Sequence, residues 1–542
     1  NMHAGLRGVR AARKATPSGA PPLTWMLCLA ACAFLLSACG IDLTNPPRLA
    51  TATAQAAAPP TATAAVLVLP APTTTAEAGS AVSPAGTPPP ASDTELTIWV
   101  NETSSDHRAL LDSIASDFAD RYGTNVAVQL VSPALLPDLV NTAVLSGTLP
   151  DLILHPVEYT AGWAADGVLD AGAADEVAAW LGRDTFGPAA LELASTEGLT
   201  AALPSDGYHQ LLLYRADWFE ALGLQPPDTY EAMAAAAERL FDREAIIYGL
   251  VIPTESNLVT TQQAFEQIAL ANGCRLIDEA GEVKFFEPAC REALGHYFTT
   301  INRFSPPGVQ TDTSARNALL SGRTGMIVTS PAILPDLAGL NPAAQPSCDE
   351  CEASDGVNYL AQNIGIVTDI RGSSPTAAPA AFGNMRNLGI TTTADREAAQ
   401  AFAQYWFEVA YPQWLSVNPE RKVPMRWGTA ESPREFIDAW GTQPLAGGDL
   451  TLVDVYGPDV VARLREGIAA APRWGIREGY GALMTRLYDE LTLSIVLQEM
   501  LSGYFNVDTT LREAYRRTVA QIPNYAFPVP TDEPTPEATS ES

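Results

Sequence analysis

Two carboxylates that follow apolar stretches are the residues of this chain best suited to catalysis. Glu158 and Asp206 could serve a glycoside hydrolase as its general acid and its base or nucleophile. No spacing enforces this pairing, because acids are abundant: Asp and Glu together number 62. The sequence has no Gly-x-Ser-x-Gly elbow, no His-Glu-x-x-His motif and no phosphate-binding loop. We therefore expect a binding protein and not an enzyme, without a metal or a cofactor.

Other polar side chains stand directly after predicted strands, where open α/β sheets bind their ligands. Two strands, at 96–100 and 152–154, are each followed by such residues. The residues are Asn101, Glu102, His155, Glu158 and Tyr159. Asn101 and Glu102 could equally be exposed loop residues, and His155 could cap a helix. We predict that this group contacts a ligand.

The N-terminal segment has the pattern of a lipoprotein signal peptide. Basic residues at 7–14 precede an apolar run at 25–36 that is too short to span a membrane. The run ends in LSAC at 36–39, and small residues before a cysteine fit the cleft of the lipoprotein signal peptidase. The alternative is an ordinary signal peptide in which Cys39 is incidental. We predict that Cys39 is lipidated and anchors the protein to the membrane.

Four further cysteines follow Cys39, and an even number outside the cytoplasm favours disulfides. Cys274 and Cys290 flank a hairpin-like stretch that a disulfide could close. Cys348 and Cys351 form a CxxC in a loop rich in Pro and Asp. A redox or zinc site would need a helix N-terminus or a second ligand pair, and neither is visible. We expect a local disulfide at each pair.

The composition is that of a large, acidic, globular protein with polar tails. A chain of 542 residues is too long for one compact domain, and 47% hydrophobic residues suffice for real cores. The formal net charge of −30 argues against nucleic acid or an anionic lipid surface as a partner. Residues 41–93 consist mainly of Ala, Thr and Pro. This composition predicts a disordered tether that reaches on the order of 40 Å.

Strands and helices alternate from Glu95 onward. We expect strands at 96–100, 126–131 and 149–154, helices at 107–122 and 135–145, and further on strands at 211–214, 248–252 and 363–367. Strands and helices alternating at this interval predict parallel βαβ units.

The stretch at 198–231, GLTAALPSDGYHQLLLYRADWFEALGLQPPDTYE, organises the rest of the chain. It contains a polar loop at 205–210, an apolar strand and a short helix closed by Gly223. This stretch resembles a segment of the family 1 extracellular solute-binding proteins, the maltose-binding-protein-like receptors of ABC importers. In that family the segment is where the chain first crosses from one lobe to the other. Arg215 and Tyr230 stand where the family prefers Asn and Trp.

Shorter motifs in the family's order extend the resemblance over about residues 95–525. They are LPDL at 149–152, GVLD at 167–170, NGCRLIDEAGEVKFFEP at 272–288, GRTGM at 322–326, LGI at 388–390 and VPMR at 423–426. The stretch at 438–468 has no clear counterpart, and we interpret it as an insertion.

The resemblance implies an α/β fold of two lobes, of the type II periplasmic-binding-protein class, with a hinge of crossing strands and a ligand cleft between the lobes. The expected limits are a signal peptide at 1–38, a tether at 39–94, lobe 1 at 95–204 and 382–430, lobe 2 at 205–381 and 431–527, and a disordered acidic tail at 528–542.

The resemblance also implies ligand contacts at several later positions. These are Asp206, Tyr208, Thr329, Ser330, Phe382, Asn384, Met385 and Trp474. Tyr208 could instead prop the hinge, and a lone Trp such as Trp474 is more often part of a core. Ala332 stands where the family has an aromatic residue, which weakens the case for a long stacked sugar. Aromatic faces and polar side chains suit a sugar, and they also suit a polyamine or another small polar solute.

The function implied by the resemblance is capture of a solute, a sugar or oligosaccharide, by closure of the lobes. The protein would then deliver the solute to the transmembrane permease of an ABC importer. We expect a monomer that is lipid-anchored to the cell membrane and faces the outside of the cytoplasm. The competing interpretations are a secreted glycoside hydrolase and a sensor or adhesin that kept the binding fold.

Overall fold

The computed structural model describes residues 95–351, 353–354 and 357–528, and all of them belong to one compact unit of the chain. The signal peptide with Cys39, the tether and the acidic tail expected from the sequence lie outside the described residues. No helix in the described part of the chain has both the length and the apolar character needed to cross a membrane.

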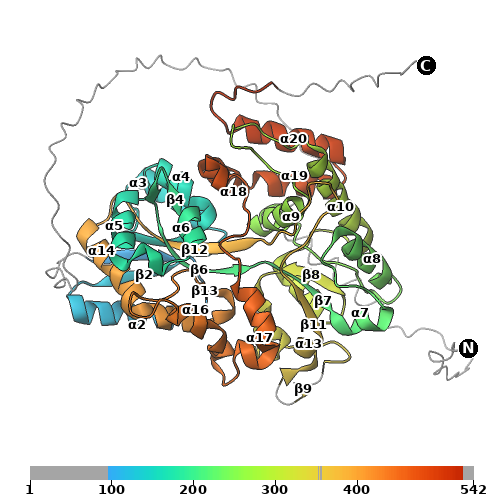
Figure 1. The fold of residues 1–542 in the computed structure, drawn as a ribbon, viewed down its shortest axis with the longest axis horizontal. Helices are drawn as coiled ribbons and strands as arrows, with labels where there is room; N and C mark the ends of the chain where they lie inside the picture. The colour runs from blue at the N-terminus through green and yellow to red at the C-terminus, as the bar shows by residue number, and fades with distance from the viewer. Residues whose placement is uncertain (1–94, 352, 355–356, 529–542) are drawn as a thin grey trace, which may run out of the picture. The chain divides into compact units, whose positions relative to one another are not determined.

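A six-stranded sheet, which we call the large sheet, lies at the centre of one half of this unit (Figure 1). Across the sheet its strands are β13 (Val423–Pro424), β6 (Leu203–His209), β12 (Gly383–Ile390), β3 (Leu152–Pro156), β1 (Leu96–Val100) and β2 (Val126–Leu130). β1 runs parallel to both β2 and β3, whereas β12 runs antiparallel to β3 and β6. The parallel βαβ units expected at the start of the globule are thus present.

Helices cover the large sheet because the sheet is apolar on both faces. Leu152 and Leu154 pack in one core with Phe118 of the helix that follows β1, whereas Ile153, on the other face of the strand, packs in a second core. The helices are α2 (Ser105–Tyr122), α3 (Leu136–Ser146), α4 (Thr160–Ala165), α5 (Ala171–Leu181), α6 (Pro188–Leu193), α14 (Arg396–Tyr405), α15 (Tyr411–Ser416) and α16 (Glu435–Ala439). Two short turns matter for the site and its surroundings: η1 (Val157–Tyr159) after β3, and the π-helical η4 (Trp406–Ala410) between α14 and α15.

A second, three-stranded antiparallel sheet, the small sheet, has the order β11 (Ile364–Val367), β7 (Leu211–Arg215) and β8 (Met326–Thr329). The strand expected at 248–252 is present only as two bridges, from Tyr248 to Thr324 and from Val251 to Ile327. The neighbouring helices are α7 (Ala216–Leu222), α8 (Tyr230–Leu240), α9 (Val259–Ala271), α10 (Pro288–Phe304), α11 (Asp312–Leu320), α12 (Leu334–Leu337) and α13 (Tyr359–Gln362).

The segments that join the two sheets differ from the expectation. The sequence predicts a polar loop at 205–210, but these residues form most of β6, and the Gln210 N–H donates to the Phe382 carbonyl oxygen at 2.9 Å. The return segment that contains Asn384 is likewise part of a strand, β12. The expected hinge of crossing strands is therefore present as β6 and β12. The loop predicted at 205–210 was wrong because its polar side chains were read as exposed, whereas Asp206 is buried and bonded to Arg386.

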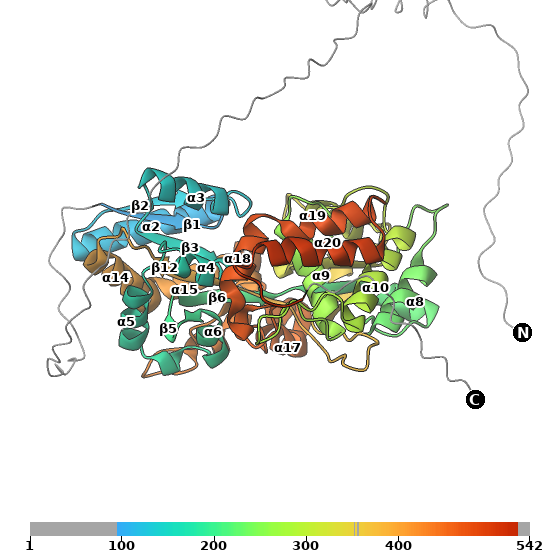
Figure 2. The ribbon, with the colours of Figure 1, turned by 90° about the horizontal axis from the view of Figure 1, so that it is seen from above.

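The C-terminal helices pack on both halves of the unit. α17 (Leu452–Arg465) shares a core with the small sheet, and α18 (Gly481–Asp489) packs on α4 and η1. α19 (Thr492–Leu501) and α20 (Val507–Ala520) lie side by side against α9 and α10 (Figure 2). Disulfides join Cys274 to Cys290 and Cys348 to Cys351.

Candidate ligand-binding site

A cavity of about 370 Å³ lies where the elements of the two sheets meet. Its wall combines the end of β3, η1, β6, β12, the end of β8, the start of α9 and the end of α18. This volume is within the range of small-molecule sites, about 300–1,000 Å³, and near its lower limit. The cavity is therefore large enough for a small solute.

Five buried polar atoms in the wall of this cavity have no hydrogen-bond partner within the described part of the chain. They are Asn101 Nδ2, Glu158 Oε2, Thr329 Oγ1, Asn384 Oδ1 and Asp489 Oδ1. An unpaired buried polar group costs about 1–3 kcal/mol, and native proteins leave few of them. Five of the nineteen such atoms in the described part of the chain thus belong to residues of this one wall, where a bound molecule can supply their partners.

Glu158 is positioned by α18. Thr485 Oγ1 donates to the Glu158 carbonyl oxygen at 2.7 Å and accepts from the Gly162 N–H at 3.1 Å. Helices α4 and α18 approach this closely because residue 162 has no side chain. A Cβ there would lie 2.4 Å from the Thr485 Cβ. Gln263 Nε2 donates to Glu158 Oε1 at 3.2 Å, which leaves Oε2 available. Burial raises the pKa of Glu158, although Arg473 acts in the opposite direction.

Arg386 of β12 also belongs to the wall and is held by two carboxylates. Its Nε donates to Asp206 Oδ1 at 2.8 Å, and its guanidinium also pairs with Glu102. The Trp414 Nε1–H donates to the other Asp206 oxygen at 2.7 Å, and Arg421 lies 3.1 Å from Glu102. Burial opposes ionisation of Glu102, but Arg421 and Arg386 outweigh it and hold its pKa at about 2. The cluster fixes the crossing strands and is electrostatically balanced.

Aromatic rings supply the apolar part of the cavity wall. Tyr159, Tyr208, Phe382 and Tyr488 all line it. Tyr159 stacks on Trp163 with ring centroids 5.0 Å apart, and Asn384 Nδ2 donates to the Tyr208 hydroxyl at 3.3 Å. Rings held by such contacts present rigid surfaces to the C–H groups of a polyhydroxylated molecule.

The structure brings eight of the thirteen predicted ligand residues to this cavity, and Met385 is instead a buried core residue. The eight are Asn101, Glu158, Tyr159, Tyr208, Thr329, Ser330, Phe382 and Asn384. These residues come from η1, from both crossing strands and from the ends of β1 and β8.

Glu102 and Asp206 do not line the cavity, because both carboxylates are bound by Arg386. The pair Glu158 and Asp206, considered above as the acids of a hydrolase, therefore does not face a common substrate. No group of three or more His, Cys, Asp or Glu residues within the described ranges is arranged to hold a metal ion.

His155 and Trp474 also lie outside the cavity wall. His155 belongs to β3 itself and does not follow it; the ring is fully buried, and its Nδ1 lies 2.9 Å from the Pro156 carbonyl oxygen. Trp474 is a core residue: its ring meets the edges of Phe265 and Phe285, and its Nε1–H donates to the Cys274 carbonyl oxygen at 2.9 Å.

Several residues of the wall were not predicted from the sequence. They are Asp138, Gln210, Gln263, Asp312, Arg316, Arg386, Arg421, Tyr488 and Asp489. The place of Arg386 in the wall could have been predicted, because in an extended segment its side chain points to the same face as that of Asn384. The helical residues gave none, because their faces are assigned only by packing.

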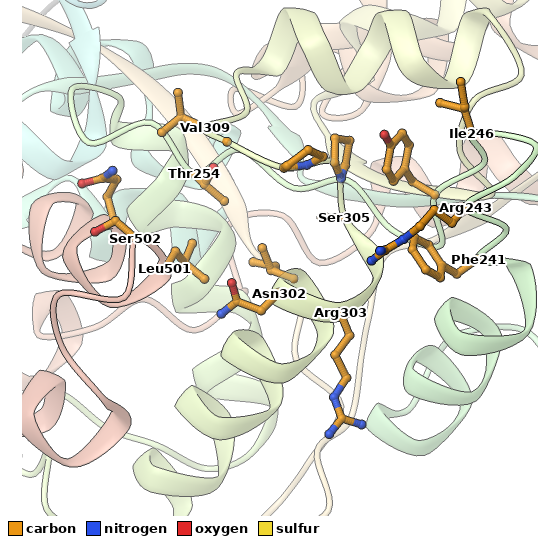
Figure 3. A pocket seen from close by; sticks show the side chains of 16 residues that line it. Phe241, Arg243, Ile246, Thr254, Asn302, Arg303, Ser305, Val309, Leu501 and Ser502 are labelled. Atoms are coloured by element: carbon orange, nitrogen blue, oxygen red, sulfur yellow. The ribbon is translucent and has the colours of Figure 1, made fainter.

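A second cavity, of about 610 Å³, lies between the end of α10, the loops at 241–248 and 305–309, and the end of α19 (Figure 3). Its wall includes exposed apolar side chains such as Ile246 and Val309. None of the buried unpaired polar atoms of the described residues belongs to this wall. It is the larger of the two cavities, but its polar side chains, such as Arg243 and Asn302, are not among the buried unpaired groups.

Comparisons with known proteins point to one family. The sequence pattern of the bacterial extracellular solute-binding protein family matches residues 113–410, which is more than half of the chain. The chain is 24% identical over 335 residues to YcjN of Escherichia coli K12, whose name assigns it to the periplasmic-binding proteins of ABC transporters. This alignment covers 59% of the chain and 72% of YcjN.

Two solved structures share the fold at low sequence identity. One is an ABC transporter solute-binding protein from Thermotoga lettingae with bound α-D-tagatose, with a TM-score of 0.61 and 20% identity; the match covers 79% of this chain and 100% of that one. The other is maltose-bound MalE3 of T. maritima, with a TM-score of 0.60, 17% identity and the same coverage. The expected type II binding-protein fold is thus confirmed, and these relatives are binding proteins and not enzymes. The chain belongs to the bacterial extracellular solute-binding protein family.

Proposed function

We propose that this protein captures a sugar or polyol outside the cytoplasm in the cavity described above. The observation that carries the proposal is the set of five unpaired buried polar atoms around a cavity lined by four aromatic rings. Hydroxyl groups can donate to and accept from such atoms, and the carbon skeleton of the solute can pack on the rings. The tagatose and maltose bound by two structural relatives are solutes of this kind.

We further propose that the protein delivers its solute to the permease of an ABC importer and is anchored by lipid on Cys39. The naming of YcjN and of the Thermotoga lettingae protein as parts of ABC transporters supports the first step. The LSAC sequence at 36–39 supports the second. Radiolabelled palmitate should label the wild-type protein and not the Cys39→Ser variant; equal labelling of both would contradict the anchor.

Ligand binding is tested by a thermal-shift screen of the purified protein against monosaccharides, disaccharides and polyols. A ligand that binds only the folded protein stabilises it by about 2.7 kcal/mol at a hundredfold excess over its Kd. We expect a shift with at least one of these solutes. Shifts only with amino acids or other solutes without a polyol skeleton would contradict the proposal.

The Thr329→Val variant tests whether the solute binds in the cavity. Thr329 Oγ1 is buried without a partner, so its removal should leave the unliganded protein as stable as before or more stable. The same change should weaken solute binding by about tenfold, because a hydrogen bond to the solute is lost. Thr518→Val is the matched control: Thr518 Oγ1 is also buried and unpaired, but it lies on α20 away from the cavity wall. Equal affinity of the Thr329→Val variant and the wild type would place the solute elsewhere.

A further inference from the structure

The cations in the cavity wall form ion pairs with carboxylates that do not belong to the wall. Arg386 pairs with Asp206 and Glu102, and Arg421 also pairs with Glu102. Neither carboxylate belongs to the wall. The third cation of the wall, Arg316, pairs in the same way with Asp336, which is buried outside the wall.

The acids in the wall have no such compensation. Among residues 95–528, outside the gaps at 352 and 355–356, no Lys, Arg or His forms an ion pair with Asp138, Asp312 or Asp489. Asp312 accepts a hydrogen bond from Thr260 at 2.8 Å and lies near Arg316, but burial outweighs that cation and raises its pKa. These acids therefore leave the cavity with an excess of negative charge.

Glu158 adds to this excess. The nearest cation is Arg473, at 3.8 Å from Glu158 Oε2, and Arg473 lies closer to Glu266, at 3.2 Å. The single Arg473 guanidinium thus pairs with two buried carboxylates. Glu158 belongs to the cavity wall and is 2% exposed, and its Oε2 is buried without a hydrogen-bond partner.

The unpaired atoms include more hydrogen-bond acceptors than donors. When the acids are ionised, Glu158 Oε2, Asn384 Oδ1 and Asp489 Oδ1 can only accept hydrogen bonds, whereas Asn101 Nδ2 can only donate. A bound molecule must therefore supply more donors than acceptors. An ammonium group offers three donors and a positive charge at once.

Three acids of the wall lie near Tyr159 and define an acidic end of the cavity. Glu158, Asp489 and Asp138 all lie close enough to raise the pKa of the Tyr159 hydroxyl, after burial as the main cause. Burial, followed by Asp138, Asp166 and Glu490, raises the pKa of Asp489 to about 6. A cation at this end would relieve the repulsion between these carboxylates and would lie beside an aromatic ring.

We propose that the solute is a polyhydroxylated molecule with a cationic amino group, of the amino-sugar class, whose ammonium lies between Glu158 and Asp489 beside Tyr159. This assignment rests on the proposed function, since it specifies the solute of the same cavity. The hydroxyl groups of the solute remain for Asn101, Thr329 and Asn384.

Isothermal titration at about pH 7, where Asp489 is ionised, tests the assignment with pairs that differ in one amino group. The pairs are D-glucosamine with D-glucose, D-galactosamine with D-galactose, D-mannosamine with D-mannose, and 6-amino-6-deoxy-D-glucose with D-glucose. We expect at least one amine to bind about tenfold or more tightly than its neutral partner. Equal or tighter binding of every neutral partner, or tightest binding of D-glucuronate, would overturn this inference and leave the proposed function intact. Binding of no sugar in the series would count against both.

The Asp489→Asn variant locates the ammonium. It should reduce the affinity for the amine by a larger factor than the affinity for its neutral partner, and thereby abolish most of the preference for the amine. Asp138→Asn, at an exposed position, should reduce the preference in the same direction with little risk to folding. Glu490→Gln is the control, because this neighbouring acid is exposed and outside the cavity wall. An unchanged preference in both Asp variants would overturn the placement.

Discussion

Single buried charges near the cavity perform two different tasks. Arg386 is buried and bonded to Asp206 and Glu102, so it stabilises the crossing strands more than it offers charge to a solute. Glu158 and Asp489 keep an unpaired oxygen each and are thereby available to a ligand. The difference is one of distance: Arg386 bonds directly to Asp206, whereas the Arg473 guanidinium stays 3.8 Å from Glu158 Oε2.

Removing Arg386 should therefore destabilise the protein. In Arg386→Met two buried carboxylates lose their main partner, and we expect the free energy of unfolding to fall by about 3–5 kcal/mol in urea denaturation without solute. Arg434→Met is the control, because Arg434 forms an exposed pair with Asp438. That change should stay within about 1 kcal/mol. A small effect of Arg386→Met would show that the cluster is dispensable for stability.

His155 should make stability depend on pH. Burial lowers its pKa from 6.5 to about 4, so the folded protein keeps it neutral while the unfolded chain becomes protonated below pH 6.5. Because the pKa of His155 is lower in the folded protein than in the unfolded chain, His155 contributes its full stability above about pH 6.5. This contribution is lost as the pH falls towards 4. Between pH 7 and 5 this single group should cost about 2 kcal/mol. Denaturation of His155→Gln should therefore show a loss smaller by that amount; an identical pH dependence of both proteins would contradict it.

At the scale of elements, the pairing of β6 with β12 holds the two sheets together. Gly383 pairs with His209 in this ladder, and the Gln210 N–H continues it to Phe382. The loop before Trp474 packs directly on this ladder: a Cβ on residue 383 would lie 2.1 Å from the Ile468 carbonyl oxygen. Any side chain here would have to displace backbone.

Gly383→Ala should accordingly lower the free energy of unfolding by about 1–3 kcal/mol. Gly295→Ala is the matched control, because residue 295 lies inside α10 and a Cβ there meets nothing within 4 Å. That change should raise stability by about 0.5–1 kcal/mol through the better helix propensity of Ala. Urea denaturation distinguishes the two signs, and a neutral Gly383→Ala would show that the ladder can shift at low cost.

At the scale of the whole molecule, the cavity joins elements that are distant in sequence. Glu158 of η1 bonds to Gln263 of α9, and Gln210 bonds to Gln267 of the same helix at 2.7 Å. A solute that contacts both sides adds further links between these elements. Local opening of the site should then require release of the solute.

We expect saturating solute to slow amide hydrogen exchange in η1, at the start of α9 and in the crossing strands. The amides of α20 lie outside the cavity wall and should change little. Hydrogen exchange followed by mass spectrometry measures both groups in one experiment. Uniform protection of all elements would indicate general stabilisation and not bridging at the cavity.

Much of the site was within reach of the sequence. Residues that follow strands, such as Asn101, Glu158 and Ser330, line the cavity because the ends of strands meet at one place in an α/β fold. The motif order over about 95–525 indicated the family, and the family fixes the fold. Cysteine spacing indicated the two local disulfides that the structure contains.

Which polar residues are available to a ligand depends on contacts that form only in the folded protein. Asp206 and Glu158 look alike in sequence, yet Arg386, 180 positions from Asp206, neutralises only the former. Asp489 and Gln263 reach the cavity through helix packing, which local periodicity does not specify. Most of the elements, their order and the family could be inferred from the sequence, because these depend on local patterns of residues. Exposure, ion pairing and charge balance in the cavity depend on contacts between distant segments, and these exist only once the chain has folded.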